Sequence, residues 1–137
     1  MTTTDESAAR DEAIRRVLRH GHTIDITTTG RVTGQPRRIE IVYHSFGGRL
    51  YISGIPNARH ERAWLLNLRA DPRLTFHLKA LVQADLLGTA REITDPFERR
   101  PILELVARAW RRTDVDNMVA HSPLIEVTLD GFEPATD

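Results

Sequence analysis

The chain is organised around residues 27–38, which read Thr27-Thr28-Thr29-Gly30-Arg31-Val32-Thr33-Gly34-Gln35-Pro36-Arg37-Arg38. Gly30 and Gly34 can adopt a positive φ, so we expect the backbone to curl there and to turn successive N–H groups inward. A concave run of N–H groups favours an anion. The stretch therefore predicts either an anion-binding turn or a long hairpin whose arginines only face solvent. The side chains that would add donors are Thr29, Arg31, Thr33, Arg37 and Arg38.

Strand-like segments lie on both sides of this turn. Residues 23–29 alternate and are rich in β-branched side chains, and residues 38–45 alternate again. Phe46-Gly47-Gly48-Arg49 predicts a hairpin into a third strand at 50–53. Because hairpin-length connections dominate, the strands predict a mainly antiparallel sheet that closes as a small barrel of about six strands. The remaining strands are expected at about 73–79, 83–93 and 124–129.

Helical patterns surround these strands. Apolar residues recur at helical spacing over 5–20, and this helix can either pack on the barrel or touch a membrane surface; its alanine-rich face favours packing. A second helix is expected at 60–69, and Asp95-Pro96-Phe97-Glu98 is a typical start for a third. Pro101 lies inside this third helix and predicts a kink or a restart. Residues 114–120 show no clear pattern. The predicted fold class is therefore α+β, with three helices covering the openings or edges of the barrel.

Composition narrows the function classes. The chain has 137 residues, the size of one domain, and no cysteine, which excludes disulfides and thiolate metal sites and fits a reducing compartment. Its formal net charge is zero, so nothing draws the whole chain to nucleic acid or to a membrane. Residues 1–10 are polar and acidic, unlike a signal peptide. His20 and His22 lack a third ligand at a suitable spacing. We therefore expect a cytoplasmic protein with no metal site.

Several blocks of the sequence resemble one known family. The turn segment Thr28-Thr29-Gly30-Arg31-x-Thr33-Gly34-Gln35-Pro36-Arg37 is followed by Tyr51-Ile52-Ser53 and by Ala63-Trp64-x-x-Asn67-Leu68-x-Ala70-Asp71-Pro72. Ala90-Arg91-Glu92-Ile93-Thr94-Asp95 and Ser122-Pro123-Leu124-Ile125-Glu126-Val127 complete the pattern. Over about residues 20–130 the chain resembles the deazaflavin (F420)-dependent nitroreductase and quinone reductase family. These are actinobacterial proteins with the split-barrel fold of flavin-binding oxidases.

The resemblance implies a fold and a reaction. The fold is an α+β, mainly antiparallel split β-barrel of the FMN-binding type over residues 23–132, with an N-terminal helix in 1–22 packed on it and a tail at 133–137. The reaction is an oxidoreduction in which reduced coenzyme F420 passes a hydride to an electron-poor small molecule, such as a quinone, an enone or a nitro compound. FMN is the alternative cofactor. Split barrels commonly pair, so a homodimer is an open expectation.

The resemblance also implies where the cofactor lies. Its phosphate would be held by arginines and backbone N–H groups of the turn, and its ring by backbone N–H groups at the end of the 50–53 strand. Side chains of the 60–69 helix would border the ring. No catalytic residue is assigned, although His121 or Ser122 is the only local candidate for a proton donor. The expected cofactor-binding residues are Arg31, Thr33, Gly34, Gln35, Pro36 and Arg37 in the turn, Ser53 and Gly54 at the strand end, and Trp64 and Asn67 on the helix.

The chain departs from the family pattern at two places. Val32 stands where the family often has lysine, and Gly54-Ile55-Pro56 stands where it often has Lys-Gly-Gly. Basic residues at the start of the following helix can replace the missing charge, because a helix N-terminus also favours anions. The alternative is a non-catalytic split-barrel protein that binds a flavin, haem or a fatty acid. The replacing residues would be Arg59, His60 and Arg62.

Overall fold

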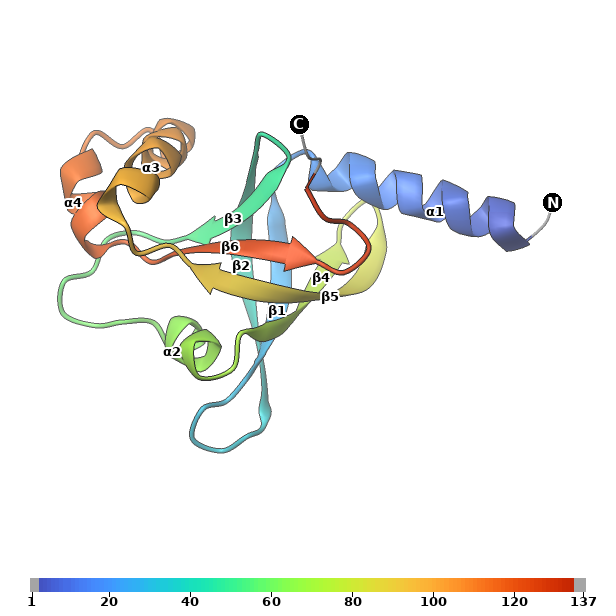
Figure 1. Cartoon of the computed structure of the whole chain (residues 1–137), viewed down its shortest axis with the longest axis horizontal. Helices are drawn as coiled ribbons and strands as arrows, with labels where there is room; N and C mark the ends of the chain where they lie inside the picture. The colour runs from blue at the N-terminus through green and yellow to red at the C-terminus, as the bar shows by residue number, and fades with distance from the viewer. Residues whose placement is uncertain (1–2, 135–137) are drawn as a thin grey trace.

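The computed structural model of the chain describes residues 3–134, and six strands in this part close into one antiparallel barrel (Figure 1). Their order around the barrel is β1-β2-β3-β6-β5-β4, and β4 returns to pair with β1. The predicted α+β class and antiparallel barrel are confirmed, whereas the predicted tail at 133–137 falls mostly outside the described residues. The strands are β1 (Thr23–Thr29), β2 (Pro36–Phe46), β3 (Arg49–Ser53), β4 (Arg73–Lys79), β5 (Gln83–Glu92) and β6 (Leu124–Leu129).

Four helices accompany the barrel in the described part of the chain, one more than the sequence predicts. The additional helix is α4, which buries only Met118 and so carries no apolar period. The predicted restart at Pro101 is wrong, because α3 continues through it. Pro101 stands in the second turn, where it removes a single backbone donor. Asp95 caps α3 as predicted, accepting from the N–H of Phe97 at 2.9 Å. The helices are α1 (Thr3–Leu18), α2 (Ala63–Ala70), α3 (Pro96–Trp110) and α4 (Val115–His121).

Helix α2 begins at Ala63, later than the predicted start at residue 60, because Asn57 holds the preceding residues in a turn. The Asn57 Oδ1 accepts from the backbone N–H groups of Arg59 at 3.0 Å and His60 at 3.2 Å. The N–H of Asn57 itself donates to the carbonyl of His121 at 3.2 Å. The loop between β3 and α2 is therefore tied to the C-terminal end of α4, as its path in Figure 1 indicates.

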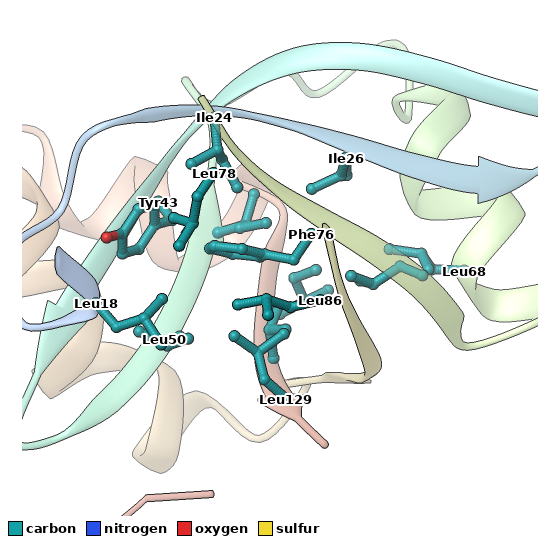
Figure 2. Close-up of a cluster of buried hydrophobic side chains, with 14 of the residues drawn as sticks. Leu18, Ile24, Ile26, Tyr43, Leu50, Leu68, Phe76, Leu78, Leu86 and Leu129 are labelled. Carbon is teal, nitrogen blue, oxygen red and sulfur yellow. The ribbon is translucent and has the colours of Figure 1, made fainter. Parts of the chain in front are cut away.

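Alternate side chains of the strands fill the barrel, which is why the period-two patterns predict it. Ile26 of β1 and Phe76 of β4 are fully buried there, and Figure 2 shows them beside Leu86 of β5. Burying one such side chain stabilises the fold by about 1.5–3 kcal/mol. The strands contribute Ile24, Ile26, Tyr43, Leu50, Ile52, Leu74, Phe76, Leu78, Ala84, Leu86, Ile125, Val127 and Leu129 to this cluster.

Helix α1 is attached to one end of the barrel by its C-terminal half. Ile14 and Leu18 join the barrel cluster, and the Tyr43 hydroxyl donates to the carbonyls of Val17 at 3.0 Å and His20 at 2.7 Å. The Val17 carbonyl also accepts from the N–H of His20 at 3.2 Å, so these bonds join β2 to the end of the helix. The helix therefore packs on the barrel, and its N-terminal part extends away from it (Figure 1). Among the described residues, no helix combines the length and apolarity needed to cross a membrane.

His44 lies in a second apolar region, where α3 and α4 pack against the outside of the barrel. Its ring stacks on Phe46 with a centroid distance of 5.6 Å and meets Trp110 at 5.2 Å. Its Nε2 is buried without a hydrogen-bond partner among the described residues. Burial lowers the pKa of His44, and it also lowers the pKa of His22, which contacts Tyr43 at the other side of the sheet.

The His44→Phe variant is expected to lose less stability than the wild type when the pH falls from about 7.5 to about 5.5. Burial lowers the pKa of His44 in the native protein, whereas the unfolded chain takes up a proton at an ordinary histidine pKa of about 6.5. The free energy of unfolding therefore decreases as the pH drops through this range. The variant removes the contribution of His44 and retains that of His22. Urea unfolding at both pH values measures the difference, and equal losses in the two proteins would contradict the prediction.

Candidate functional site

The basic turn between β1 and β2 is closed by hydrogen bonds of its own backbone. The N–H of Gly30 donates to the carbonyl of Gln35, and the N–H of Gly34 donates to the carbonyl of Gly30, both at 2.8 Å. Gly34 has a positive φ of 72°, as predicted, but Gly30 does not, so that expectation is wrong. Glycine is needed at position 30 for another reason: a Cβ would lie 3.0 Å from the Gln35 carbonyl and the Thr33 hydroxyl. The N–H of Gly34 is therefore already used inside the turn.

Asn67 of α2 fixes this turn against the helix. Its Oδ1 accepts from the backbone N–H of Arg31 at 3.0 Å, and its Nδ2 donates to the hydroxyl of Thr28 at 3.1 Å. The side chain is buried, with 6% of the residue exposed. Both polar ends of the amide are thus engaged within the protein. Asn67 therefore positions the turn that carries Arg31.

A hollow of about 480 Å³ and a smaller one of about 290 Å³ flank α2, and the smaller one lies beside the basic turn. We call the smaller one the turn pocket. The side chains of Arg31 and Arg37 line it, are exposed and make no hydrogen bond or ion pair within residues 3–134. Buried Trp64 and the apolar side chain of Ile39 add apolar surface. Its lining is Thr28, Gly30, Arg31, Val32, Thr33, Arg37, Ile39, Ala63, Trp64 and Asn67.

The remaining residues expected at the cofactor do not line the turn pocket. Gly34 and Pro36 border a separate hollow beside β4 and β5. Gln35 closes the turn through its backbone. Ser53 ends β3, and Gly54 follows it against the side chain of Arg62. The structure therefore brings together only part of the expected set, namely Arg31, Thr33, Arg37, Trp64 and Asn67.

The larger hollow, which we call the loop pocket, lies between the β3–α2 loop and the ends of α3 and α4. Leu65 and Arg69 of α2 line it, whereas Trp64 and Asn67 line the turn pocket. Opposite faces of one short helix therefore border the two hollows. The loop pocket is lined by Asn57, Ala58, Arg59, His60, Glu61, Arg62, Leu65, Arg69, Glu92, Thr94, Pro96, Arg99, Val119, Ala120, His121, Ser122 and Pro123.

Ser53 and Gly54 adjoin the loop pocket, and Arg62 lies over them. The Ser53 hydroxyl donates to the carbonyl of Pro123 at 2.6 Å. A Cβ on Gly54 would lie 2.7 Å from the Arg62 Cζ, so any other residue here would displace the end of the Arg62 side chain. Arg62 also donates to the carbonyl of Ile55 at 2.7 Å, and burial lowers its pKa. The backbone of Gly54 can reach a ligand in the loop pocket only if the Arg62 side chain moves.

Charges in the loop pocket are partly paired. Arg69 donates to Glu92 at 2.7 and 2.8 Å and also binds Glu61, whose pKa it lowers. Arg59 and His60 have no side-chain hydrogen bond or ion pair within residues 3–134. They were expected to replace charge missing at Val32, but they precede α2 and line the loop pocket, whereas Val32 lines the turn pocket. The unpaired positive charge of this loop therefore belongs to the loop pocket.

Arg99 holds the wall of the loop pocket that α4 forms. Its guanidinium donates to the carbonyls of Ile93 at 2.8 Å and Ser122 at 2.6 Å. Further bonds reach the carbonyls of Val119 at 3.0 Å and Met118 at 3.3 Å. Carbonyls at a helix C-terminus are favourable partners for a cation. Arg99 thus fixes the end of α4 with no carboxylate partner in the described structure.

The family comparison bears on this arrangement. The model of the F420H(2)-dependent quinone reductase family matches residues 2–128, nearly the whole chain. The chain belongs to this family. Membership confirms the resemblance noted in the sequence and makes the protein an oxidoreductase whose coenzyme is the deazaflavin F420.

Solved structures similar to this F420H(2)-dependent quinone reductase family member support its fold, at identities too low to say more. A conserved hypothetical protein from Mycobacterium tuberculosis is 20% identical with a TM-score of 0.65, over 87% of this chain and 79% of that one. An F420 reductase is 15% identical with a TM-score of 0.61, over 89% and 93%. A Listeria innocua protein described as a pyridoxamine 5′-phosphate oxidase is 17% identical with a TM-score of 0.60, over 89% and 94%. The barrel is thus of the split-barrel type.

The turn pocket fits the anionic part of coenzyme F420, which carries a phosphodiester and an acidic tail. Arg31 and Arg37 are cations without an internal partner, and no carboxylate lines the pocket. Arginine donors suit phosphate oxygens. Buried Trp64 adds a flat apolar surface. The ring's expected contact at Gly54 is reached on the other side of α2 and lies under Arg62.

Sequence reasoning missed several residues of these two pockets. Thr28 could have been found, because it continues the inward alternation of Ile24 and Ile26 in β1 and is likewise buried. Arg99 could not have been found, because its partners are backbone carbonyls of distant segments, and any residue type can supply a carbonyl. The same holds for Arg62 over Gly54.

Proposed function

We propose that this family member passes a hydride from reduced F420 to an electron-poor small molecule, such as a quinone, an enone or a nitro compound. The proposal rests on the two arginines of the turn pocket, Arg31 and Arg37, which have no partner within the described residues and stand beside Trp64. It includes the expected cytoplasmic location and homodimer, and sizing chromatography tests the dimer.

In this proposal, Arg31 and Arg37 bind the phosphodiester and acidic tail by charge-assisted hydrogen bonds, and Thr33 adds a hydroxyl. Asn67 holds the Arg31 backbone in place. Trp64 keeps water from one side of the bound group. The backbone at Ser53 and Gly54 meets the ring edge after Arg62 moves aside. When bound, reduced F420 supplies the hydride, two electrons with one proton, and water supplies the second proton that completes reduction of the acceptor.

The acceptor, in the same proposal, lies in the loop pocket. Hydride addition to a carbonyl compound or a quinone builds negative charge on oxygen, so a nearby donor lowers the barrier. Ser122 lines this pocket and is 5% exposed, and its Oγ has no hydrogen-bond partner in the described structure. His121 lines the pocket next to it. Their part is to stabilise this charge.

Titration of the purified protein with oxidised F420 tests the proposal. We expect saturable binding at micromolar coenzyme with quenching of tryptophan fluorescence, because Trp64 lines the turn pocket. The Trp110→Phe variant should retain the quenching and Trp64→Phe should lose it, since Trp110 is the last residue of α3, contacts His44 and does not line the turn pocket. If F420 does not bind and FMN, haem or a fatty acid binds instead, the protein is a non-catalytic carrier and the proposal is wrong.

A further inference from the structure

The loop pocket has more positive than negative charge in its lining. Four arginines and two glutamates line it, before the histidines are counted. Both glutamates are bound by Arg69, and this group of three side chains has one negative charge in excess. Arg59 has no side-chain partner within residues 3–134, and Arg62 and Arg99 donate only to neutral carbonyls. Three cations of the lining therefore have no carboxylate partner, and the formal charge of the lining is positive.

A buried hydroxyl without a partner lies in the same pocket. The Ser122 residue is 5% exposed and its Oγ makes no hydrogen bond in the described structure. Native proteins seldom leave such a group unsatisfied, and a bound ligand is one ordinary reason for it. The hydroxyl can both donate and accept, so it suits an oxygen-bearing group. This observation is independent of the charge count and concerns a residue that lines the same pocket.

The remaining lining suits a small flat molecule. Leu65, Pro96, Val119 and Pro123 supply apolar surface, and the hollow has a volume of about 480 Å³. A long hydrocarbon tail needs a continuous apolar trough, whereas charged and polar residues interrupt this lining. The pocket thus combines room for a ring with a positive edge.

We propose that the loop pocket selects a hydride acceptor that carries a carboxylate or another anionic group, held by Arg59 and Arg62 with Ser122 beside its ring oxygen. The inference rests on the proposed function only where it calls the ligand a hydride acceptor. The preference for an anionic ligand is argued from the residues of the loop pocket alone. Arginine forks bind carboxylates in pairs of hydrogen bonds, so the anionic group fixes the orientation of the ring. Arg62, drawn to the anion, leaves Gly54 accessible.

Binding of two matched, non-reducible probes to the coenzyme-free protein tests this inference. 2-Naphthoate carries the anion, and 2-naphthamide has a similar shape without charge. We expect calorimetry to give at least about tenfold tighter binding of naphthoate, a ratio typical of one charge-assisted contact. Raising the salt concentration should weaken naphthoate binding and leave naphthamide binding nearly unchanged. Equal affinities of the two probes would overturn the inference.

Variants locate the binding. In Arg59→Gln with Arg62→Gln, the preference for naphthoate should fall to near unity while naphthamide still binds. Arg31→Ala with Arg37→Ala removes two cations from the turn pocket and should leave the preference intact. Loss of the preference in this second variant alone would place the anion in the turn pocket and refute the proposal.

A kinetic readout follows if the coenzyme binds. With reduced F420 and a carboxylated naphthoquinone, Arg59→Gln with Arg62→Gln should raise KM with kcat little changed, because a uniform binding contact is lost. A neutral naphthoquinone should show no such rise. Since the calorimetry needs no coenzyme, failure of the F420 titration and failure of this inference are told apart.

Discussion

Replacing Arg31 and Arg37 together by alanine should abolish F420 binding at micromolar coenzyme. Each guanidinium has no partner within residues 3–134 and lines the turn pocket, so each is free to bind a phosphate oxygen. A hydrogen bond to a charged group contributes about 1.5–3 kcal/mol, so each single variant should weaken binding roughly tenfold to a hundredfold. Because both arginines bind one ligand, the double variant need not equal the sum of the singles.

Fluorescence titration at two salt concentrations measures this effect. A matched control is Arg38→Ala with Arg100→Ala, which removes the same net charge outside the turn pocket. Arg38 pairs with Asp25 at 2.9 Å and Arg100 pairs with Asp116 at 2.9 Å, both at the surface. The control should bind F420 with an affinity within about twofold of wild type, because surface charges far from a ligand are largely screened. Unchanged affinity in the double Arg31 and Arg37 variant would remove both residues from the site.

The Arg99→Leu variant should lower the free energy of unfolding by about 3–5 kcal/mol, because each buried acceptor that is left unsatisfied costs about 1–3 kcal/mol. Arg99 is 8% exposed and donates to carbonyls of Ile93, Met118, Val119 and Ser122. Without the guanidinium these carbonyls lose a charged donor that leucine does not replace, although Met118 still accepts from the N–H of Ser122. Arg99→Lys should recover only part of the loss, because an ammonium group lacks the planar fork of arginine.

Urea unfolding measures this loss, and the neighbouring residue supplies the control. Arg100 is half exposed and pairs only with Asp116 at the surface. Arg100→Leu should change stability by less than about 1 kcal/mol, as exposed ion pairs usually do. If Arg99→Leu lowered the free energy of unfolding no more than Arg100→Leu, the hydrogen bonds from Arg99 to the carbonyls would not contribute to stability.

The sequence predicts the barrel well because strand alternation is local and strict. Residues 23–29 and 124–129 coincide with β1 and β6, since inward-facing apolar residues mark these segments in the chain itself. Helix α4 escapes prediction for the opposite reason. Its single buried residue, Met118, gives no period to recognise.

The site is predicted less completely than the fold. Arg31, Arg37 and Trp64 come together at the turn pocket. The β1–β2 turn carries the two arginines and α2 carries the tryptophan, and the sequence motif predicts that these two segments pack together. What the sequence cannot supply is which polar groups are already occupied. The N–H of Gly34 and the amide of Asn67 look like ligand donors in a motif, but in the fold both are used internally. Whether a donor is already hydrogen-bonded inside the protein depends on tertiary contacts.

Helix α2 separates the two pockets with residues only a few positions apart. Trp64 and Asn67 border one hollow, and Leu65 and Arg69 border the other. Under the proposed function, substitutions at Leu65 and Arg69 would change which molecule is reduced while Arg31, Arg37 and Trp64 of the turn pocket stay as they are. In protein engineering, a library restricted to that face would vary substrate range without rebuilding the turn pocket. In evolution, the same separation would let relatives diverge in substrate while sharing one coenzyme.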